Sequence, residues 1–227
     1  MPTFAQTKPL HIGQIIRHAR CFRFAEHSEN RMTLDSLLQS VDNLFALLDE
    51  RRVTYVLVGG IALLQYVEGR NTEDIDLIVS LSDLRKVPEI RIANRDKNFA
   101  RGDFQGLQID FLLTSNRLFE KVCRTHTTLQ PFAERAIPCA TVEGLLLLKL
   151  YALPSLYRQG NFARVGLYEN DIATLLQAYQ PETEPLLAEL SHQVNAADMA
   201  EIRMILADVE ARIRRFGQGF QAGSTNE

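Results

Sequence analysis

The sequence predicts an α/β (α+β) fold, in which a small mixed sheet with its own helices is followed by a C-terminal helical unit. Two observations carry this prediction. Short segments rich in β-branched residues occur only before residue 140, and only helical patterns follow it. The chain has 227 residues, of which 46% are hydrophobic and 23% charged. This composition is typical of a folded protein with a buried core and excludes collagen-like and mostly disordered classes.

The net charge and the cysteines indicate which partners and which cellular compartment the protein suits. A net charge of -3 gives no overall attraction to nucleic acid or acidic lipid, so a polyanionic partner would need a local basic patch. The 3 cysteines form no Cys-x-x-Cys pair, which favours reduced thiols. No apolar run is long enough for a signal peptide or a membrane span, so we expect a cytoplasmic protein without membrane contact.

The N-terminal part combines a polar arm with a helix. Residues 1–31 are polar and basic with weak periodicity, which predicts an arm that is either poorly ordered or docked on the rest. From Thr33 onward, leucines and a valine recur at steps of three and four residues up to Leu48. This spacing predicts an amphipathic helix, which Thr33 can cap.

Two strands follow, joined by a glycine turn. Residues 53–58 are apolar and β-branched and end at Gly59 and Gly60, which predicts a buried strand entering a tight turn. We expect a helix over 61–67, then a polar loop over 68–73. In the next strand, residues 74–79, alternation puts Asp74 and Asp76 on one face and the apolar side chains on the other.

A hairpin supplies a third carboxylate. Residues 98–103 and 107–113 flank a short turn, and alternation in the second arm places Asp110 on the face opposite Ile109 and Phe111. A helix over 116–123 and an extended piece over 137–139 complete this part.

Helical patterns fill the remainder of the chain. An apolar helix over 142–153 contains Lys149, and a loop is expected over 154–166. Three further helices are predicted over 167–180, 185–193 and 196–216. The expected organisation is therefore an arm over 1–31, a sheet domain over 32–140 and a helical domain over 141–227.

The three aspartates predict a metal site. Two carboxylates at i and i+2 on one strand and a third from another strand repel one another unless a cation joins them, and oxygen ligands suit Mg²⁺ or Mn²⁺. Gly59 and Gly60, between a strand and a helix start, let backbone N–H groups approach a phosphate. Together these features favour phosphoryl or nucleotidyl transfer. A calcium loop and a dinucleotide fingerprint are excluded, because their glycine spacings are missing.

The motif Val58-Gly59-Gly60, a spacer and then Asp74-Ile75-Asp76-Leu77 resembles the signature of the polymerase-β-type nucleotidyltransferase superfamily. Several further residues resemble its AbiEii/MenT-like group, whose members are often toxins of toxin–antitoxin pairs; they are Arg70, Thr72, Ile109-Asp110-Phe111, Lys149 and Asp171-Ile172. The resemblance covers about residues 53–176. It implies a minimal nucleotidyltransferase fold in 32–140, Mg²⁺ dependence, an NTP substrate, tRNA or another RNA as acceptor, and a cognate antitoxin as partner.

The resemblance also implies roles for individual residues. Asp74, Asp76 and Asp110 would bind metal, and Asp110 would activate the acceptor hydroxyl. The remaining residues would bind the nucleotide, with Lys149 offsetting triphosphate charge; they are Gly59, Gly60, Arg70, Thr72, Lys149 and Asp171.

Other interpretations of these residues remain open at this stage. Lys149 could place its ammonium at the surface, and Asp171 could simply favour the start of its helix. Arg70 could be a loop charge. The acceptor could be a small hydroxyl compound, as in aminoglycoside nucleotidyltransferases, or a protein side chain, and the chain could be a non-catalytic binding module of the same fold. Three basic clusters could meet RNA phosphates, and they lie in the arm, over 85–101 and over 212–215.

Overall fold

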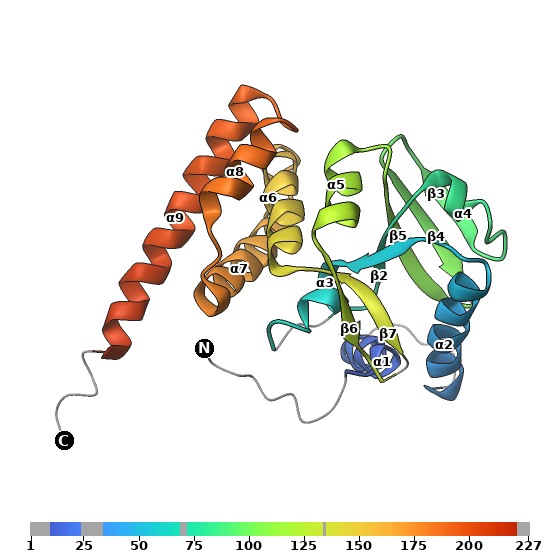
Figure 1. Cartoon of the computed structure of the whole chain (residues 1–227). Coiled ribbons are helices and arrows are strands. Elements are labelled where there is room, and N and C mark those ends of the chain that lie inside the picture. The colour runs from blue at the N-terminus through green and yellow to red at the C-terminus, as the bar shows by residue number, and fades with distance from the viewer. Residues whose placement is uncertain (1–9, 24–33, 69–71, 134, 222–227) are drawn as a thin grey trace, which may run out of the picture. The chain divides into compact units, whose positions relative to one another are not determined.

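The computed structural model describes residues 10–23, 34–68, 72–133 and 135–221. The chain divides into two compact units, Met1–Thr141 and Val142–Glu227 (Figure 1). Among the described residues, no helix is both long and apolar enough to cross a bilayer.

The first unit is built on one mixed sheet. Its strands are β1 (Tyr55–Val58), β2 (Ile75–Val79), β3 (Arg91–Arg95), β4 (Phe99–Phe104), β5 (Leu107–Leu113), β6 (Thr127–Pro131) and β7 (Ala136–Ala140). Its helices are α1 (Ile12–Arg23), α2 (Leu34–Glu50), α3 (Gly59–Leu63), α4 (Leu81–Leu84) and α5 (Arg117–Thr125). The strand order is β3-β4-β5-β2-β1-β7-β6, with parallel pairing between β2 and β5 and between β1 and β7. The predicted mixed sheet is thereby confirmed.

The sheet is wider than the sequence predicted, because two polar strands extend its edges. Every residue of β3 is exposed, and β6 has no buried residue. Neither strand has the apolar alternation that reveals a half-buried strand, which is why both escaped the sequence analysis.

Helices cover both faces of this sheet. Phe45 of α2 packs against Tyr55, whose partner on β2 is Val79, so α2 lies on the face formed by the apolar side chains of β2. Phe119 of α5 meets Phe99 edge to face, at a centroid distance of 5.3 Å. Because side chains alternate along a strand, Phe99 shares its face with Arg101 and, across the sheet, with Asp110. The face carrying the carboxylates is therefore the one that α5 partly covers.

Part of the predicted arm is a packed helix. Ile12, Ile16 and Ala19 of α1 are buried, and α1 packs on α2. Of the two alternatives for the arm, docking is correct for Ile12–Arg23. Thr33, the predicted cap of α2, lies outside the described residues.

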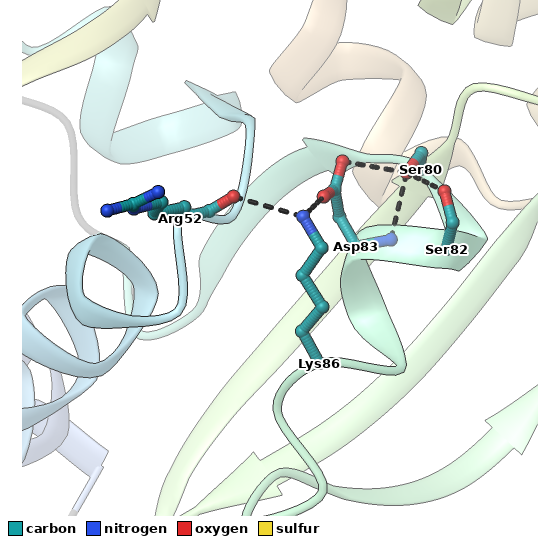
Figure 2. A network of polar contacts seen from close by, with 5 residues as sticks. All are labelled: Arg52, Ser80, Ser82, Asp83 and Lys86. Atoms are coloured by element: carbon teal, nitrogen blue, oxygen red, sulfur yellow. Dashed lines mark hydrogen bonds and ion pairs between the residues drawn. The ribbon is translucent and has the colours of Figure 1, made fainter.

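A polar network connects two turns of the first unit (Figure 2). Asp83 accepts hydrogen bonds from Lys86 at 2.5 Å and from the Ser80 hydroxyl at 2.8 Å. Lys86 also donates to the carbonyl oxygen of Arg52, at 3.1 Å. Arg52 has a φ of 50° in the turn between α2 and β1, so the ammonium joins that turn to the one after β2.

The second unit consists of helices α6 (Val142–Arg158), α7 (Phe162–Tyr179), α8 (Thr183–Ser191) and α9 (Ala196–Gln221). The predicted helical unit is confirmed, but the loop over 154–166 is wrong. The helix continues through Pro154 to Arg158, because Leu153 and Leu156 extend its buried face. After a short turn, the side chain of Asn161 caps α7 by accepting from the backbone N–H of Arg164.

Candidate functional site

The sheet brings two of the predicted carboxylates side by side. Asp76 on β2 is the direct register partner of Asp110 on β5, and on its other side it faces Val58, the last residue of β1. Register partners project to the same face, so both carboxylates stand on the face that α5 partly covers. Asp74 immediately precedes β2. The parallel pairing of β2 with β5 thus brings together Asp76 and Asp110, which are 34 positions apart in the sequence.

The glycine turn allows Asp76 to lie against the backbone. Gly59 has a φ of +66°, and a Cβ added there would stand 1.9 Å from the Asp76 Oδ2 atom and 2.8 Å from the Asp76 Cβ atom. A Cβ added at Gly60 would stand 2.5 Å from the Thr72 hydroxyl oxygen. These approaches are possible only without side chains, so the two glycines, Asp76 and Thr72 form one compact cluster where β1 passes into α3.

Arg101, which the sequence placed only in the basic cluster over 85–101, completes this row of side chains. It is the partner of Asp110 on β4, and its guanidinium binds that carboxylate with two hydrogen bonds. The Nε atom lies 2.6 Å from Oδ1, and an Nη atom lies 2.7 Å from Oδ2. The hydrogen bonds to Asp110, and after them the charges of Asp110, Asp74 and Asp76, raise the pKa of Arg101, although partial burial opposes this. All three aspartates therefore act electrostatically on one cation.

The donor set suits a hard divalent cation. Mg²⁺ is usually held by one or two carboxylates together with substrate phosphates, and Asp74 and Asp76 can supply those carboxylates. Across the described residues, however, no cluster of three or more acidic, His or Cys side chains is arranged to hold a metal ion. Both oxygens of Asp110 accept hydrogen bonds from Arg101.

The second unit holds Lys149 and Asp171 as a buried ion pair. The Lys149 ammonium lies 2.7 Å from the Asp171 carboxylate, and the two side chains are only 6% and 4% exposed. The ammonium also stands over the ring of Tyr168, 4.4 Å from its centroid. Lys149 therefore does not reach the surface, and Asp171 lies well inside α7 rather than at its start. Both of these simpler interpretations are wrong.

Several other predicted residues are placed as follows. Arg70 lies outside the described residues. The first basic cluster, Arg17, Arg20 and Arg23, lies on α1. Arg91 and Arg95 of the second cluster stand exposed on the edge strand β3. Cys139 is buried and Cys123 partly buried, each as a free thiol. Burial raises the pKa of the Cys139 thiol to about 12, so it stays protonated at neutral pH.

No protein-family model matches the chain, and no curated protein gives a significant match. Solved structures of nucleotidyltransferases are similar to it. The crystal structure of ANT(2")-Ia in complex with adenylyl-2"-tobramycin is 12% identical, with a TM-score of 0.49 over 79% of this chain and 99% of that one.

Two further structures give similar values. The solution structure of the same antibiotic-resistance factor is also 12% identical, with a TM-score of 0.47 over 80% of this chain and 96% of that one. An antigenic nucleotidyltransferase-like protein from Paracoccidioides brasiliensis is 17% identical, with a TM-score of 0.45 over 74% and 92%. Since all three TM-scores are below 0.5, this likeness carries no argument about activity.

Proposed function

We propose that the chain is a Mg²⁺-dependent nucleotidyltransferase that moves a nucleotide from an NTP to a hydroxyl acceptor. One observation carries the proposal: Asp76 and Asp110 are register partners on adjacent strands, and Asp76 lies against the Gly59 turn. Adjacent carboxylates beside a glycine turn suit an enzyme that handles a metal-bound triphosphate.

The residues divide the chemistry among them. In the proposed transfer, the acceptor oxygen forms a bond to the α-phosphorus, the bond from that phosphorus to the bridging β-phosphate oxygen breaks, and pyrophosphate leaves. Asp110 is the base that takes the proton of the acceptor hydroxyl. The backbone N–H groups of the Gly59-Gly60 turn are proposed to bind the triphosphate, with Asp76 packed against the same turn. Asp74 and Asp76 supply carboxylate oxygens. Bound Mg²⁺ would neutralise triphosphate and carboxylate charge.

The acceptor that we propose is RNA, most specifically the 3′ end of tRNA. The edge strand β3 supports this, because Arg91 is exposed and pairs with Asp103, which lies on the same face of the sheet as Arg101 and Asp110, so Arg91 can meet backbone phosphates. The resemblance of the Gly-Gly and Asp-Ile-Asp-Leu motifs to AbiEii/MenT-like enzymes supports the same acceptor, and with it a role as the toxin of a toxin–antitoxin pair.

The roles of the remaining candidates stay predictions. Thr72 packs at Gly60 and is proposed to bind the nucleotide from there. Contacts of Arg70, Lys149 and Asp171 with the triphosphate are proposed from the resemblance alone. For the last two, the buried ion pair means that a direct contact would require the pair to open.

The proposal is tested with purified protein, Mg²⁺, each labelled NTP and total tRNA. We expect label to pass to RNA, and Asp76→Asn to abolish the transfer while leaving the fold intact by circular dichroism. Asp96→Asn, which changes a carboxylate in the loop between β3 and β4, is the matched control and should keep activity. Unchanged labelling by Asp76→Asn would contradict the assignment of the site.

An acceptor screen distinguishes the other hypotheses. Label on a small hydroxyl compound or on protein, and none on RNA, would keep the chemistry and overturn the RNA acceptor. Calorimetry with a non-hydrolysable NTP analogue tests the binding-module hypothesis: failure to bind with Mg²⁺ present would favour a non-catalytic module.

A further inference from the structure

The guanidinium of Arg101 lies where a metal ion would have to bind Asp110. Its two hydrogen bonds, at 2.6 and 2.7 Å, engage both carboxylate oxygens, so a metal ion or an acceptor proton must compete with the guanidinium for Asp110. The charges of Asp74 and Asp76 act on the same guanidinium. Without the Arg101 guanidinium, β4 would supply no positive charge to balance the carboxylates of Asp74, Asp76 and Asp110.

The geometry of the pair is set by the backbone. Residues 105 and 106 form a two-residue hairpin turn, with φ values of 50° and 79°. This turn fixes the pairing of β4 with β5, so Arg101 is always opposite Asp110. The guanidinium fork matches a carboxylate in a plane, which a lysine ammonium would not do.

The pair is also placed so that it can open. The Arg101 side chain is 50% exposed, and Asp110 is 19% exposed. An exposed ion pair contributes little net stability, so a divalent cation with a polyphosphate can compete with it. The Lys149 pair of the second unit differs, since both of its members are buried and its separation would strand a charge.

We propose that Arg101 is a built-in counter-cation that withholds Asp110 until a metal-bound nucleotide displaces it. The inference rests on the proposed function. Arg101 is a positioning residue: it balances the carboxylates of the unloaded site and disfavours metal binding without nucleotide. Once displaced, its side chain is released toward solvent and can bind phosphate oxygens.

The test measures metal binding rather than activity. Mn²⁺ is titrated into the full chain without nucleotide, and free Mn²⁺ is followed by electron paramagnetic resonance. We expect Arg101→Met to bind Mn²⁺ more tightly than the wild type, by up to about fivefold, the upper value for loss of one exposed competing ion pair. Arg101→Lys, which keeps the charge and loses the fork, should gain less.

Arg95→Met is the matched control, since it removes the same charge from the neighbouring strand β3. It should leave Mn²⁺ affinity nearly unchanged. Equal gains in Arg95→Met and Arg101→Met would overturn the inference, because they would indicate a general charge effect. An affinity of Arg101→Met equal to that of the wild type would overturn it as well.

A second measurement covers the case in which Arg101→Met folds poorly. In the wild-type protein, the Nε–H signal of Arg101 in a ¹⁵N NMR spectrum should shift when Mg²⁺ and a non-hydrolysable NTP analogue are added together. A signal that stays in place while the nucleotide binds contradicts displacement and leaves the proposed function standing. If the wild type binds neither nucleotide nor metal under any condition, the proposed function itself fails, and the inference fails with it.

Discussion

Gly59 holds a hydrogen atom where any other residue would place a carbon atom inside the space of a carboxylate. Its φ of +66° lies in the left-handed region, and its neighbour Asp76 is the acidic residue closest to it. Two independent demands, on conformation and on space, meet at this residue.

Gly59→Ala should therefore disrupt the site. The added Cβ would stand 2.8 Å from the Asp76 Cβ atom, so rotation of the side chain cannot relieve the clash and the strand must shift. We expect a loss of at least about 2 kcal/mol in the free energy of unfolding, measured with urea, and loss of nucleotide binding.

Gly166→Ala is the control for that substitution. Gly166 lies inside α7 with nothing within 4 Å of its Cβ position, so alanine should stabilise the protein by about 0.5–1 kcal/mol. Equal effects of the two substitutions would contradict the tight approach at Gly59.

At the scale of elements, the Lys149–Asp171 pair couples α6 to α7. Lys149→Met would leave the Asp171 carboxylate buried without its partner, and we expect a loss of about 3–5 kcal/mol in the free energy of unfolding. The double variant Lys149→Met/Asp171→Leu should recover most of this loss, because no buried charge is left. A double variant as unstable as the single one would mean that packing, rather than charge, sets the effect.

The network of Figure 2 predicts a pH dependence of stability. Partial burial raises the pKa of Asp83, but hydrogen bonds from Lys86 and Ser80 outweigh it and lower that pKa below its usual 3.8. A carboxyl with a lower pKa in the folded state stabilises the protein fully above the unfolded pKa, and this stabilisation is lost as pH falls through the folded pKa.

Asp83→Asn should accordingly lower the melting temperature at neutral pH, and the difference from the wild type should shrink as the pH falls below 3.8. Lys86→Met should reproduce the effect, and the double variant should add little to it. A difference that persists undiminished in acid would contradict the role of the ionised carboxylate.

In the sheet as a whole, the sequence predicts individual strands but not which strands lie side by side. Alternation in residues 74–79 and 107–113 was sufficient to predict two central strands and the common face of their aspartates. The adjacency of β2 and β5 was not predictable from local pattern, because it depends on a long crossover through the edge strands.

The pairing of Arg101 with Asp110 was not predicted, although the sequence contains a signal for it. Counting outward from the turn at Gln105 and Gly106 pairs Asp103 with Gln108 and Arg101 with Asp110, as the structure has it. The presence of a hairpin does not by itself reveal the ion pair, because the ion pair depends on the register. Helix α1 was missed for another reason: its polar residues obscure a narrow apolar stripe that docks on α2.

That stripe yields a prediction for the stability of the first unit. Ile16→Ala should cost about 2–5 kcal/mol in the free energy of unfolding, because Ile16 is fully buried. Gln14→Ala, an exposed change on the same helix, should stay within about 0.5 kcal/mol of the wild type. Equal unfolding midpoints for the two variants in urea would mean that α1 does not stay docked in solution.

The pairing of β2 with β5 also limits which length changes the gene can tolerate. One residue inserted directly after Gly106 would shift the register of β5 by one. Asp110 would then point to the apolar face of the sheet, and Ile109 to the face that now carries the carboxylates. The outer strand β3 already contains an irregularity between Ile92 and Asn94 and can absorb such a change. Insertions should therefore be tolerated in the edge strand β3 and not in the central strands β2 and β5.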